Sequence, residues 1–200
     1  MDKRLQAALS LYTPGEWGAD IGTDHGFLPC AVLEQGICQR MIAADLRPAA
    51  LEKAFEIYPE VKLVVVAHLY GTPGKIDEIQ AIAKKHGALI VEDAAESFGA
   101  TYKGVQTGMF GTESVISYNG NKIITGSSGG MLLTDSEEEA NKIRKWSTQS
   151  REDAAWYQHE ELGFNYRMSN IIAGVVRGQL PYLEEHIAQK KAIYERYKEG

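Results

Sequence analysis

Short runs of apolar and β-branched residues alternate with longer amphipathic stretches along this chain, and no other feature constrains the fold as strongly. Leu63–Ala67 is such a run, and parallel strands buried on both faces have this continuous apolar character. Isoleucines at helical spacing follow it, and Gly87 is a stop signal for the helix that they predict. The alternation is typical of βαβ units, so we expect an α/β fold, a three-layer α/β/α sandwich with a mostly parallel, Rossmann-like sheet. The predicted strands are Gly18–Thr23, Arg40–Asp45, Lys62–His68, Ala88–Glu92, Ser114–Tyr118 and Gly130–Leu133.

The chain changes character after Asp135. Ser136–Glu139 predicts the start of a helix, with acidic residues in the first turn, where the helix dipole favours them. A loop rich in Trp, Tyr and His follows, and then two helical stretches, Ser169–Leu180 and Tyr182–Lys198. Pro181 lies between them and either kinks one long helix or starts a second. We therefore expect trailing C-terminal helices within a single α/β domain, residues 1–200.

Charge and hydropathy exclude several classes of function. The chain has 21 basic and 27 acidic residues, and its net charge of −6 opposes an electrostatic grip on nucleic acid. No apolar run approaches the roughly 20 residues that a membrane helix needs, and the first residues do not resemble a signal peptide. Two cysteines are too few for a disulfide framework or a four-cysteine zinc site, and no metal is predicted. We expect a cytoplasmic protein with no membrane or nucleic-acid partner.

A glycine turn near the N-terminus is the first candidate site. The segment Asp20–Gly26 (D-I-G-T-D-H-G) follows a predicted strand, and Asp45 ends the next strand. Glycines at such a turn let a ligand approach the backbone, and an acid after the second strand can bind ribose hydroxyls. A tight turn without a ligand explains the glycines equally well. Because Asp20 and Asp24 would repel a phosphate, the turn suits a phosphate-free ligand with a positive centre, such as S-adenosylmethionine.

Residues 4–50 resemble the start of bacterial tRNA adenine-N1 methyltransferases, a branch of the class I methyltransferases. The matching segments are D-I-G-T-D-H-G-F-L-P (Asp20–Pro29) and I-A-A-D-L-R-P (Ile42–Pro48). The resemblance implies a vestigial S-adenosylmethionine site at Asp20, Gly22 and Asp45. It ends near residue 50, before the adenine contact and the catalytic loop that such an enzyme needs.

A second candidate site combines an acid after one strand with a lysine after another. Asp93 follows a predicted strand, and Lys122 lies between another strand and the glycine-rich residues 125–130. The carboxyl ends of parallel strands meet at one edge of the sheet, where open α/β sites form. The pair suits pyridoxal phosphate, because a lysine makes its Schiff base and an acid keeps its pyridine nitrogen protonated. Spacing alone leaves Asp93 as a strand-end cap and Lys122 as a surface charge open as alternatives.

Residues 51–200 resemble the DegT/DnrJ/EryC1 family of pyridoxal-phosphate sugar aminotransferases. Within it they are most similar to the bacillosamine-type enzymes that aminate nucleotide-linked keto sugars. The segments that carry the resemblance are V-V-V-A-H-L-Y-G-T-P (Val64–Pro73), V-E-D-A-A-E-S-F-G-A (Val91–Ala100), S-Y-N-G-N-K-I-I-T (Ser117–Thr125) and G-F-N-Y-R-M-S-N (Gly163–Asn170).

The aminotransferase resemblance implies roles for five residues. Lys122 would be the catalytic residue, bound to the cofactor and later moving a proton between the cofactor and the sugar carbon. Asp93 would pair with the pyridinium, Ser117 would hydrogen-bond the cofactor phosphate, and Glu96 would lie near the ring hydroxyl. Asn165 would reach the phosphate in a neighbouring subunit, which implies a homodimer with shared sites. Turn-forming roles for Ser117 and Glu96, and a loop-bracing role for Asn165, stay open.

Four other polar or aromatic residues have two interpretations each. His68 is more simply a hydrogen-bonded histidine at a strand end than a catalyst. Trp156, Tyr157 and His159 could line a sugar pocket or pack within their loop.

The two resemblances meet near Ala49–Phe55, in a stretch that would serve either family as a helix. Upstream of Val61, the aminotransferase family should have a Gly/Thr/Ser-rich turn for the cofactor phosphate and an aromatic residue on the cofactor ring. The methyltransferase-like segment stands there instead, and we do not expect the family's small C-terminal domain within this length.

The sequence therefore predicts the core of a pyridoxal-phosphate-dependent nucleotide-sugar aminotransferase, a transferase with weak or no activity. Its substrates would be a nucleotide-linked keto sugar and an amino donor. The first alternative is an engineered chimera without enzymatic function, built from a methyltransferase-like segment, residues 1–50, and an aminotransferase large-domain core, residues 51–200. The second is a methyltransferase fragment that binds S-adenosylmethionine.

Overall fold

The structure is a computed structural model that describes residues 6, 8–11, 14–21, 27–44, 48–57 and 61–199. The chain divides into two compact units, residues 1–112 (unit 1) and residues 113–200 (unit 2). That division does not test the prediction of a single domain assembled from segments 1–50 and 51–200, which stays a prediction.

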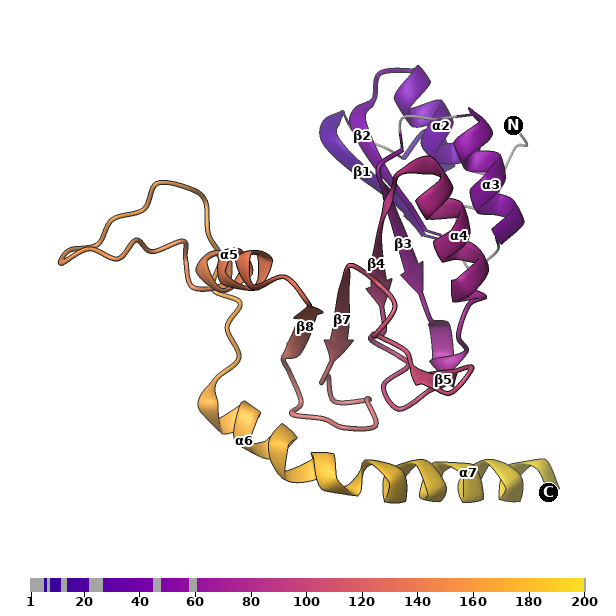
Figure 1. Ribbon diagram of the computed structural model, residues 1–200, viewed down its shortest axis with the longest axis vertical. Coiled ribbons are helices and arrows are strands. Elements are labelled where there is room, and N and C mark those ends of the chain that lie inside the picture. The colour runs from indigo at the N-terminus through magenta and orange to yellow at the C-terminus, as the bar shows by residue number, and fades with distance from the viewer. Residues whose placement is uncertain are drawn as a thin grey trace. The chain divides into compact units, whose positions relative to one another are not determined.

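Unit 1 is built on parallel strands in the order β1-β2-β3-β4 (Figure 1). β1 is parallel to β2, β2 contacts β3 through Ala44 and Val65, and β3 is parallel to β4. One helix follows each of the first three strands, as the alternating sequence pattern predicted. The elements are β1 (Gly15–Ile21), α2 (Phe27–Glu34), β2 (Cys38–Ala44), α3 (Pro48–Ile57), β3 (Leu63–Ala67), a 3-10 turn η1 (Leu69–Gly71), α4 (Ile76–His86), β4 (Leu89–Asp93) and the two short strands β5 (Thr101–Tyr102) and β6 (Val105–Gln106).

The core of unit 1 lies between the helices and one face of the sheet. Val64 and Val66 of β3 are buried, whereas Leu63 is exposed and Val65 half-buried. The apolar run had predicted burial on both faces, and the structure fully buries one, because α3 and α4 pack against that face. This core cluster consists of Phe55, Val64, Val66, Ile76, Ile79, Ala83 and Ile90.

Local signals set the ends of α4. Asp77 and Glu78 occupy its first turn, and Lys84 and Lys85 its last turn, so both charge signs complement the helix dipole. Gly87 ends the helix in the left-handed conformation, with φ 66°, and its N–H donates to the carbonyl oxygens of the last turn. This confirms the predicted stop, since glycine enters that conformation without a Cβ penalty.

Unit 2 contains an antiparallel strand pair followed by helices. Its elements are β7 (Glu113–Ser117), β8 (Gly130–Thr134), α5 (Glu137–Ser147), α6 (Asn170–Gln179), a 3-10 turn η2 (Leu180–Tyr182) and α7 (Leu183–Glu199). The hydroxyl of Ser136 accepts the Glu139 N–H and caps α5, and the hydroxyl of Ser169 caps α6 in the same way. Pro181 lies in η2, so a short tight turn separates the two last helices.

These elements confirm the predicted fold class: an α/β protein with a mostly parallel sheet and trailing C-terminal helices. Within the ranges that the structure describes, no helix is long and apolar enough to cross a membrane.

Candidate functional site

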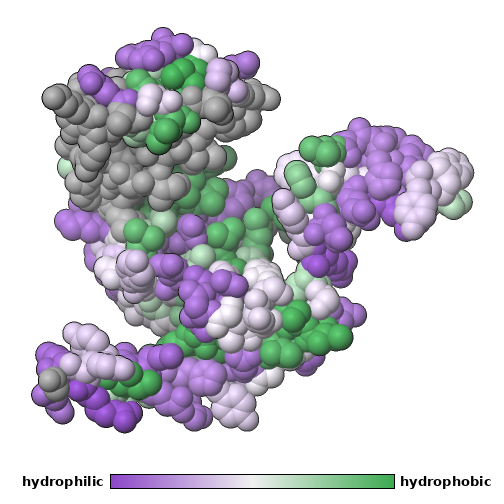
Figure 2. Space-filling model, turned by 180° about the vertical axis from the view of Figure 1, so that it is seen from behind, coloured by the Kyte–Doolittle hydropathy of each residue, from purple (hydrophilic) through white to green (hydrophobic). Residues whose placement is uncertain are grey.

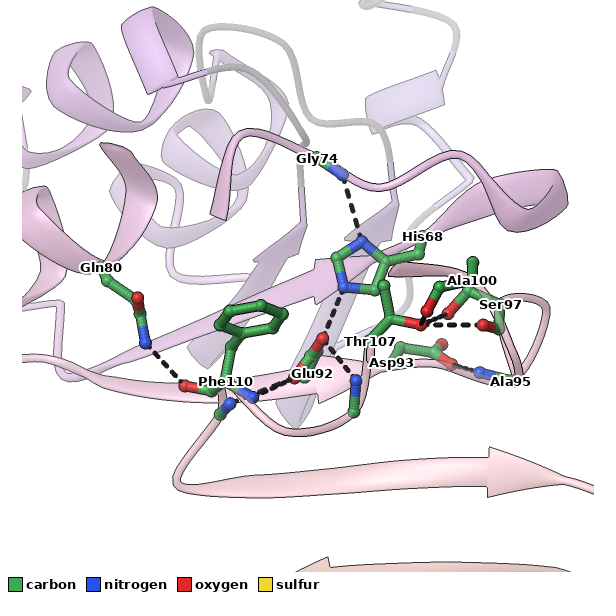
Figure 3. Close-up of polar contacts among 12 residues, drawn as sticks. His68, Gly74, Gln80, Glu92, Asp93, Ala95, Ser97, Ala100, Thr107 and Phe110 are labelled. Carbon is green, nitrogen blue, oxygen red and sulfur yellow. Dashed lines mark hydrogen bonds and ion pairs between the residues drawn. The ribbon is translucent and has the colours of Figure 1, made fainter. Parts of the chain in front are cut away.

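Polar residues of unit 1 gather where β3 and β4 end (Figure 3). Ala67 and Asp93, the last residues of the two strands, are register partners. The next residue, His68, donates its backbone N–H to the Asp93 carbonyl oxygen at 3.0 Å. The carboxyl edge of a parallel sheet is where open α/β proteins bind ligands, so this edge is the candidate site of unit 1.

The carboxylate of Glu92 lies at the centre of this cluster and is fully buried. Its Oε1 accepts hydrogen bonds from His68 Nε2 at 2.8 Å and from the Gly108 N–H at 2.6 Å. Its Oε2 accepts the N–H groups of Phe110 and Gly111 at 2.8 and 3.1 Å. Four donors therefore replace the water that this charge loses on burial.

The partners of His68 determine its tautomer. The Gly74 N–H lies 3.2 Å from Nδ1, and because a backbone N–H can only donate, Nδ1 is the acceptor. The proton then resides on Nε2 and points at Glu92. The imidazole is buried, and it joins the segment after η1 to β4, as expected for a hydrogen-bonded histidine at a strand end.

The same contacts set the ionisation of Glu92. Burial acts most strongly and raises the pKa of the carboxyl, but hydrogen bonds from His68, Gly108 and Phe110 favour the charged form. Together they outweigh burial and hold the pKa below its usual range. Glu92 is thus a carboxylate that organises the loops at the sheet edge.

Asp93 and Glu96 lie in the turn after β4. Asp93 is half-buried, and its Oδ1 accepts the Ala95 N–H at 3.1 Å, so the strand-end cap interpretation is correct for one oxygen. The other oxygen retains the capacity to accept a hydrogen bond from a ligand. Glu96 is exposed, and its Oε2 accepts the backbone N–H of Tyr70, in η1, at 2.8 Å.

A buried hydroxyl pair fixes the far side of this turn. Thr107 Oγ1 lies 2.8 Å from both the carbonyl oxygen and the hydroxyl of Ser97, and the side chains of both residues are buried. The Thr107 N–H also donates to the Ala100 carbonyl oxygen at 3.0 Å. These contacts therefore join the two ends of the segment between Ser97 and Thr107, which follows Asp93 and Glu96 in the chain.

Ser117 and Lys122 lie in unit 2, at the end of β7 and in the loop that follows it. The Ser117 hydroxyl accepts the Asn119 N–H at 3.2 Å, and the Lys122 N–H donates to the Asn119 carbonyl oxygen at 3.0 Å. Both side chains are half-buried. Ser117 thus has the turn-forming contact that the sequence left open, and the Lys122 N–H closes a turn with Asn119.

The loop that carries Lys122 is tied to α6. The Gln179 side chain accepts the Thr125 N–H at 3.2 Å and donates to the Thr125 carbonyl oxygen at 2.6 Å. A Cβ on Gly126 would lie 2.6 Å from Ile172 Cγ2, so only glycine fits this close approach to the helix. Ser127 and Gly129 have φ values of 66° and 90° and turn the chain into β8.

Asn165 is exposed and forms an isolated antiparallel bridge with Thr148, so its backbone braces the loop after α5. In this loop, His159 Nδ1 lies 2.8 Å from the Gln149 carbonyl oxygen, and the guanidinium of Arg151 lies 4.5 Å from the centre of the Tyr157 ring. These contacts fit packing within the loop. Trp156 and Tyr157 of this loop are exposed, and the loop is coloured mainly pale and purple in Figure 2, the colours of intermediate and hydrophilic residues.

Glu161 anchors the loop to α5. Lys142 lies 2.7 Å from its carboxylate, and Trp146 Nε1 and Lys145 are 3.0 and 3.1 Å away. The Lys142 ammonium, followed by the Trp146 and Lys145 donors, lowers the pKa of the Glu161 carboxyl to about 2.

The first candidate site falls largely outside the described residues. Gly22 and Asp45 are not described, and Asp20 is described only as a backbone position of β1, in register with Ala43 of β2. The predicted S-adenosylmethionine contacts therefore stay predictions, as do the roles assigned to Lys122, Asp93, Glu96, Ser117 and Asn165.

The sequence did not reveal the roles of Glu92, Thr107 or Tyr70. A glutamate inside an apolar strand was the available signal for the first, because a buried charge requires several hydrogen-bond donors. Thr107 and Tyr70 lie in segments without periodicity, and no sequence signal identified them.

Two family models match the chain and overlap. Residues 42–200 match the DegT/DnrJ/EryC1/StrS aminotransferase family, and residues 1–69 match a methyltransferase domain. These matches confirm the aminotransferase family and a methyltransferase-domain likeness, whereas the tRNA adenine-N1 branch and the bacillosamine type stay predictions. The matches overlap over residues 42–69 instead of meeting at one position.

Known proteins resemble the chain in sequence and in fold. EpsN of Bacillus subtilis (strain 168), provisionally named a pyridoxal phosphate-dependent aminotransferase, is 46% identical over 158 residues, which are 77% of this chain and 41% of EpsN. GDP-perosamine synthase of Caulobacter vibrioides is 38% identical over 143 residues, 72% of this chain and 38% of the synthase. The solved structure of the aminotransferase TlmJ from Streptoalloteichus hindustanus has a TM-score of 0.73 at 24% identity, covering 98% of this chain and 54% of TlmJ.

The structural likeness at that identity shows a shared fold. The chain spans about two fifths of the length of the curated relatives named above. The aminotransferase match covers residues 42–200, well over half of the sequence. This chain belongs to the DegT/DnrJ/EryC1/StrS aminotransferase family.

Proposed function

We propose that the chain is the core of a pyridoxal-phosphate-dependent aminotransferase that transfers an amino group to a nucleotide-linked keto sugar. The observation that carries the proposal is the family match over residues 42–200, which contains the five residues assigned to the cofactor, Asp93, Glu96, Ser117, Lys122 and Asn165. GDP-perosamine synthase, a relative at 38% identity, supports a nucleotide-linked product. Because the chain spans about two fifths of such relatives, its substrates, amino donor and activity are part of the proposal.

The residues in hand fit the chemistry of this cofactor. Asp93 is a half-buried carboxylate at the sheet edge, with an oxygen that can accept the pyridinium N–H. Ser117 contributes a hydroxyl suited to a phosphate, and Lys122 contributes an amine on a loop whose backbone is fixed. Pyridoxal phosphate, when bound, supplies an electron sink for the bonds broken at the substrate carbon.

Each residue then has a defined task. Lys122 holds the cofactor and moves a proton at its Nζ, which requires its amine to lose a proton within the site. Asp93 keeps the pyridine nitrogen protonated, and Glu96 lies near the ring hydroxyl. Asn165 contributes to the phosphate site of a second copy, so the working form is a homodimer. The proposal includes a cytoplasmic protein without a nucleic-acid, membrane or metal partner.

We expect weak or no activity from this chain. Residues 1–41 lie outside the aminotransferase match and within the methyltransferase match. The phosphate-binding turn and the stacking aromatic that the family resemblance predicts upstream of Val61 have no counterpart in that sequence.

The cofactor proposal is tested by one absorption spectrum. The purified chain mixed with pyridoxal phosphate should gain the visible band of a lysine-bound cofactor, and borohydride should fix a pyridoxyl group on the peptide that contains Lys122. Lys122→Ala should lose both signals, whereas Lys84→Ala, which removes an exposed lysine from α4, should keep them. Equal spectra for the parent and Lys122→Ala would refute Lys122 as the cofactor lysine.

A second candidate function follows from the methyltransferase match over residues 1–69. S-adenosylmethionine would bind at Asp20, Gly22 and Asp45, as a vestige of a bacterial tRNA adenine-N1 methyltransferase. Calorimetry with S-adenosylmethionine should give heat that Asp45→Ala abolishes. No heat from the parent would retire this candidate.

The overlap of the two family matches over residues 42–69 favours a third candidate, an engineered chimera that tests whether two α/β folds share an exchangeable part. Such a chain has a fold and no enzymatic function, because fold does not bring function with it. It predicts that neither the cofactor band nor heat with S-adenosylmethionine appears. Either signal excludes it.

A further inference from the structure

The turn after β3 holds an aromatic residue in a backbone conformation that it rarely adopts. Within η1, Tyr70 has φ 53° and ψ 29°, and Gly71 has φ 75°. Glycine enters the left-handed region freely, but a bulky side chain does so at an energetic cost. Residues held in such conformations cluster at ligand-contact sites, where the surrounding structure enforces them. Tyr70 is therefore held by its neighbours and not by its own preference.

Two hydrogen bonds from β4 and its turn hold η1 in place. The Tyr70 N–H donates to Glu96 Oε2 at 2.8 Å, and the His68 N–H donates to the Asp93 carbonyl oxygen at 3.0 Å. On the other side of the turn, the Gly74 N–H reaches the His68 ring at 3.2 Å. Tyr70 is thus connected directly to Glu96 and, through His68, to Asp93.

Packing does not offset the cost of this conformation. The Tyr70 side chain is 91% exposed, so its ring gains little from burial in this chain. The backbone of Tyr70 is held by Glu96 and the faces of its ring are open, so a ligand can reach the ring without displacing another side chain. Tyr70 follows the carboxyl end of a parallel strand, where α/β proteins bind ligands, so its exposed ring is in a suitable position to contact one.

We propose that Tyr70 is a substrate-contact residue that packs its ring against the sugar of a nucleotide-linked sugar, and that Glu96 is the residue that positions it. The proposal rests on the proposed function and adds a specificity contact to it. An aromatic face carries partial negative charge and attracts the weakly positive C–H groups of a pyranose, and the phenol hydroxyl can hydrogen-bond a sugar hydroxyl.

The sugar is favoured over the base for a geometric reason. Glu96 is the residue expected at the cofactor ring, and its carboxylate is bonded to the Tyr70 backbone. A group in contact with Tyr70 therefore lies close to the reacting carbon, which belongs to the sugar. The base of the same substrate is separated from that carbon by a diphosphate.

The test compares sugar nucleotides with bare nucleotides on the full 200-residue chain. Calorimetry with GDP-mannose and GDP, and with UDP-N-acetylglucosamine and UDP, gives the gain in affinity that each sugar contributes. Tyr70→Gly should lower this gain about tenfold for at least one pair, a typical loss for an aromatic contact residue. Its melting temperature should not fall, because glycine accepts a φ of 53°. Tyr70→Phe keeps the ring and should keep most of the gain.

The matched control is Tyr197→Ala, which removes a tyrosine that is 84% exposed on α7 and should leave the gain unchanged. Positioning by Glu96 is tested by Glu96→Ala, which removes the acceptor of the Tyr70 N–H, and by Glu96→Gln, which retains one. Glu96→Ala should weaken sugar binding, Glu96→Gln should restore it, and adding Tyr70→Gly to Glu96→Ala should cost no more than Tyr70→Gly alone.

The outcomes separate this proposal from the cofactor proposal. Tyr70→Gly with an unchanged sugar gain overturns the role of Tyr70, as does a parent chain in which neither sugar improves on its bare nucleotide. If the lysine-bound cofactor band is present in that parent, the cofactor proposal stands alone. A sugar gain that depends on the Tyr70 ring in a chain without the band supports the substrate contact and refutes the cofactor role of Lys122.

Discussion

Replacing Glu92 with glutamine exchanges one oxygen of a buried carboxylate for an NH2 group at nearly constant volume. Each carboxylate oxygen accepts two hydrogen bonds, Oε1 from His68 and Gly108 and Oε2 from Phe110 and Gly111. An amide nitrogen at either position would face two N–H groups, and it cannot accept a hydrogen bond from either of them. Moving the imidazole proton does not help, because a proton on Nδ1 would face the Gly74 N–H.

The number of N–H donors left without an acceptor gives the expected loss of stability. Each buried donor without an acceptor costs about 1 to 3 kcal/mol, so two of them predict a decrease of about 2 to 6 kcal/mol in the free energy of unfolding. Urea denaturation of the full chain at pH 7 measures it. The control is Glu78→Gln on α4, whose exposed carboxylate lies 3.0 Å from Lys75 and which should change stability by less than about 1 kcal/mol.

The pH dependence adds a second criterion. The folded-state pKa of Glu92 is lowered, so its carboxylate stabilises the fold fully at pH values above the unfolded-state pKa of about 4.3. This stabilisation is lost as the pH falls through the folded-state pKa. The stability difference between parent and Glu92→Gln should stay constant from neutral pH to about 5 and narrow below about 4. A Glu92→Gln protein within about 0.5 kcal/mol of the parent at pH 7 would refute the hydrogen-bond argument.

Two further predictions concern unit 2. Gly126→Ala places a Cβ 2.6 Å from Ile172 Cγ2 and should destabilise the chain by about 1 to 3 kcal/mol, whereas Gly174→Ala on α6 meets open space and should stabilise it by up to about 1 kcal/mol; urea midpoints that move in the same direction would contradict the contact. Glu161→Gln should speed hydrogen exchange in the loop after α5, because it removes the charge that pairs with Lys142 at 2.7 Å. Because the folded-state pKa of Glu161 is about 2, its carboxylate stabilises the loop fully at pH values above the unfolded-state pKa of about 4.3. This stabilisation disappears as the pH falls through about 2. A salt-independent effect of Glu161→Gln at neutral pH would argue against the ion pair.

The sequence predicted the features of this fold that depend on neighbouring residues. Gly87 stops α4 and Ser136 caps α5 through contacts within a few residues, so each signal is complete in a short window. Each of the six predicted strands overlaps a strand of the structure, and the predicted ends at Thr23 and Asp45 lie outside the described residues. The hairpin of β5 and β6 was not predicted, because its strands have two residues each and cannot display a period. Its turn had one signal, Gly104 at φ 84°, preceded by Lys103 where asparagine is the stronger indicator.

The candidate site was less predictable because its contacts are distant in sequence. Asp93 was singled out by its position after a strand, but its neighbour Glu92 is held by N–H groups from residues 108, 110 and 111. Those donors lie in a segment without repeating pattern, and a backbone donor leaves no trace in the residue type. Tyr70 has the same problem, since its N–H donates to Glu96, 26 residues away.

The two family matches overlap over residues 42–69, a stretch that includes all of α3. Phe55 of this helix is buried in the core with Val64 and Ile90 of the neighbouring strands, and its ring stacks on His86 of α4 at 4.2 Å between centroids. Such a contact requires an apolar side chain of suitable size at one helix position, and helices of many sequences supply it. By contrast, the register from β3 to β4 runs through five consecutive residue pairs and cannot be exchanged one side at a time. A helix that meets its core through a few apolar side chains therefore tolerates more sequence change than the paired strands β3 and β4, whose register fixes the carboxyl edge of unit 1.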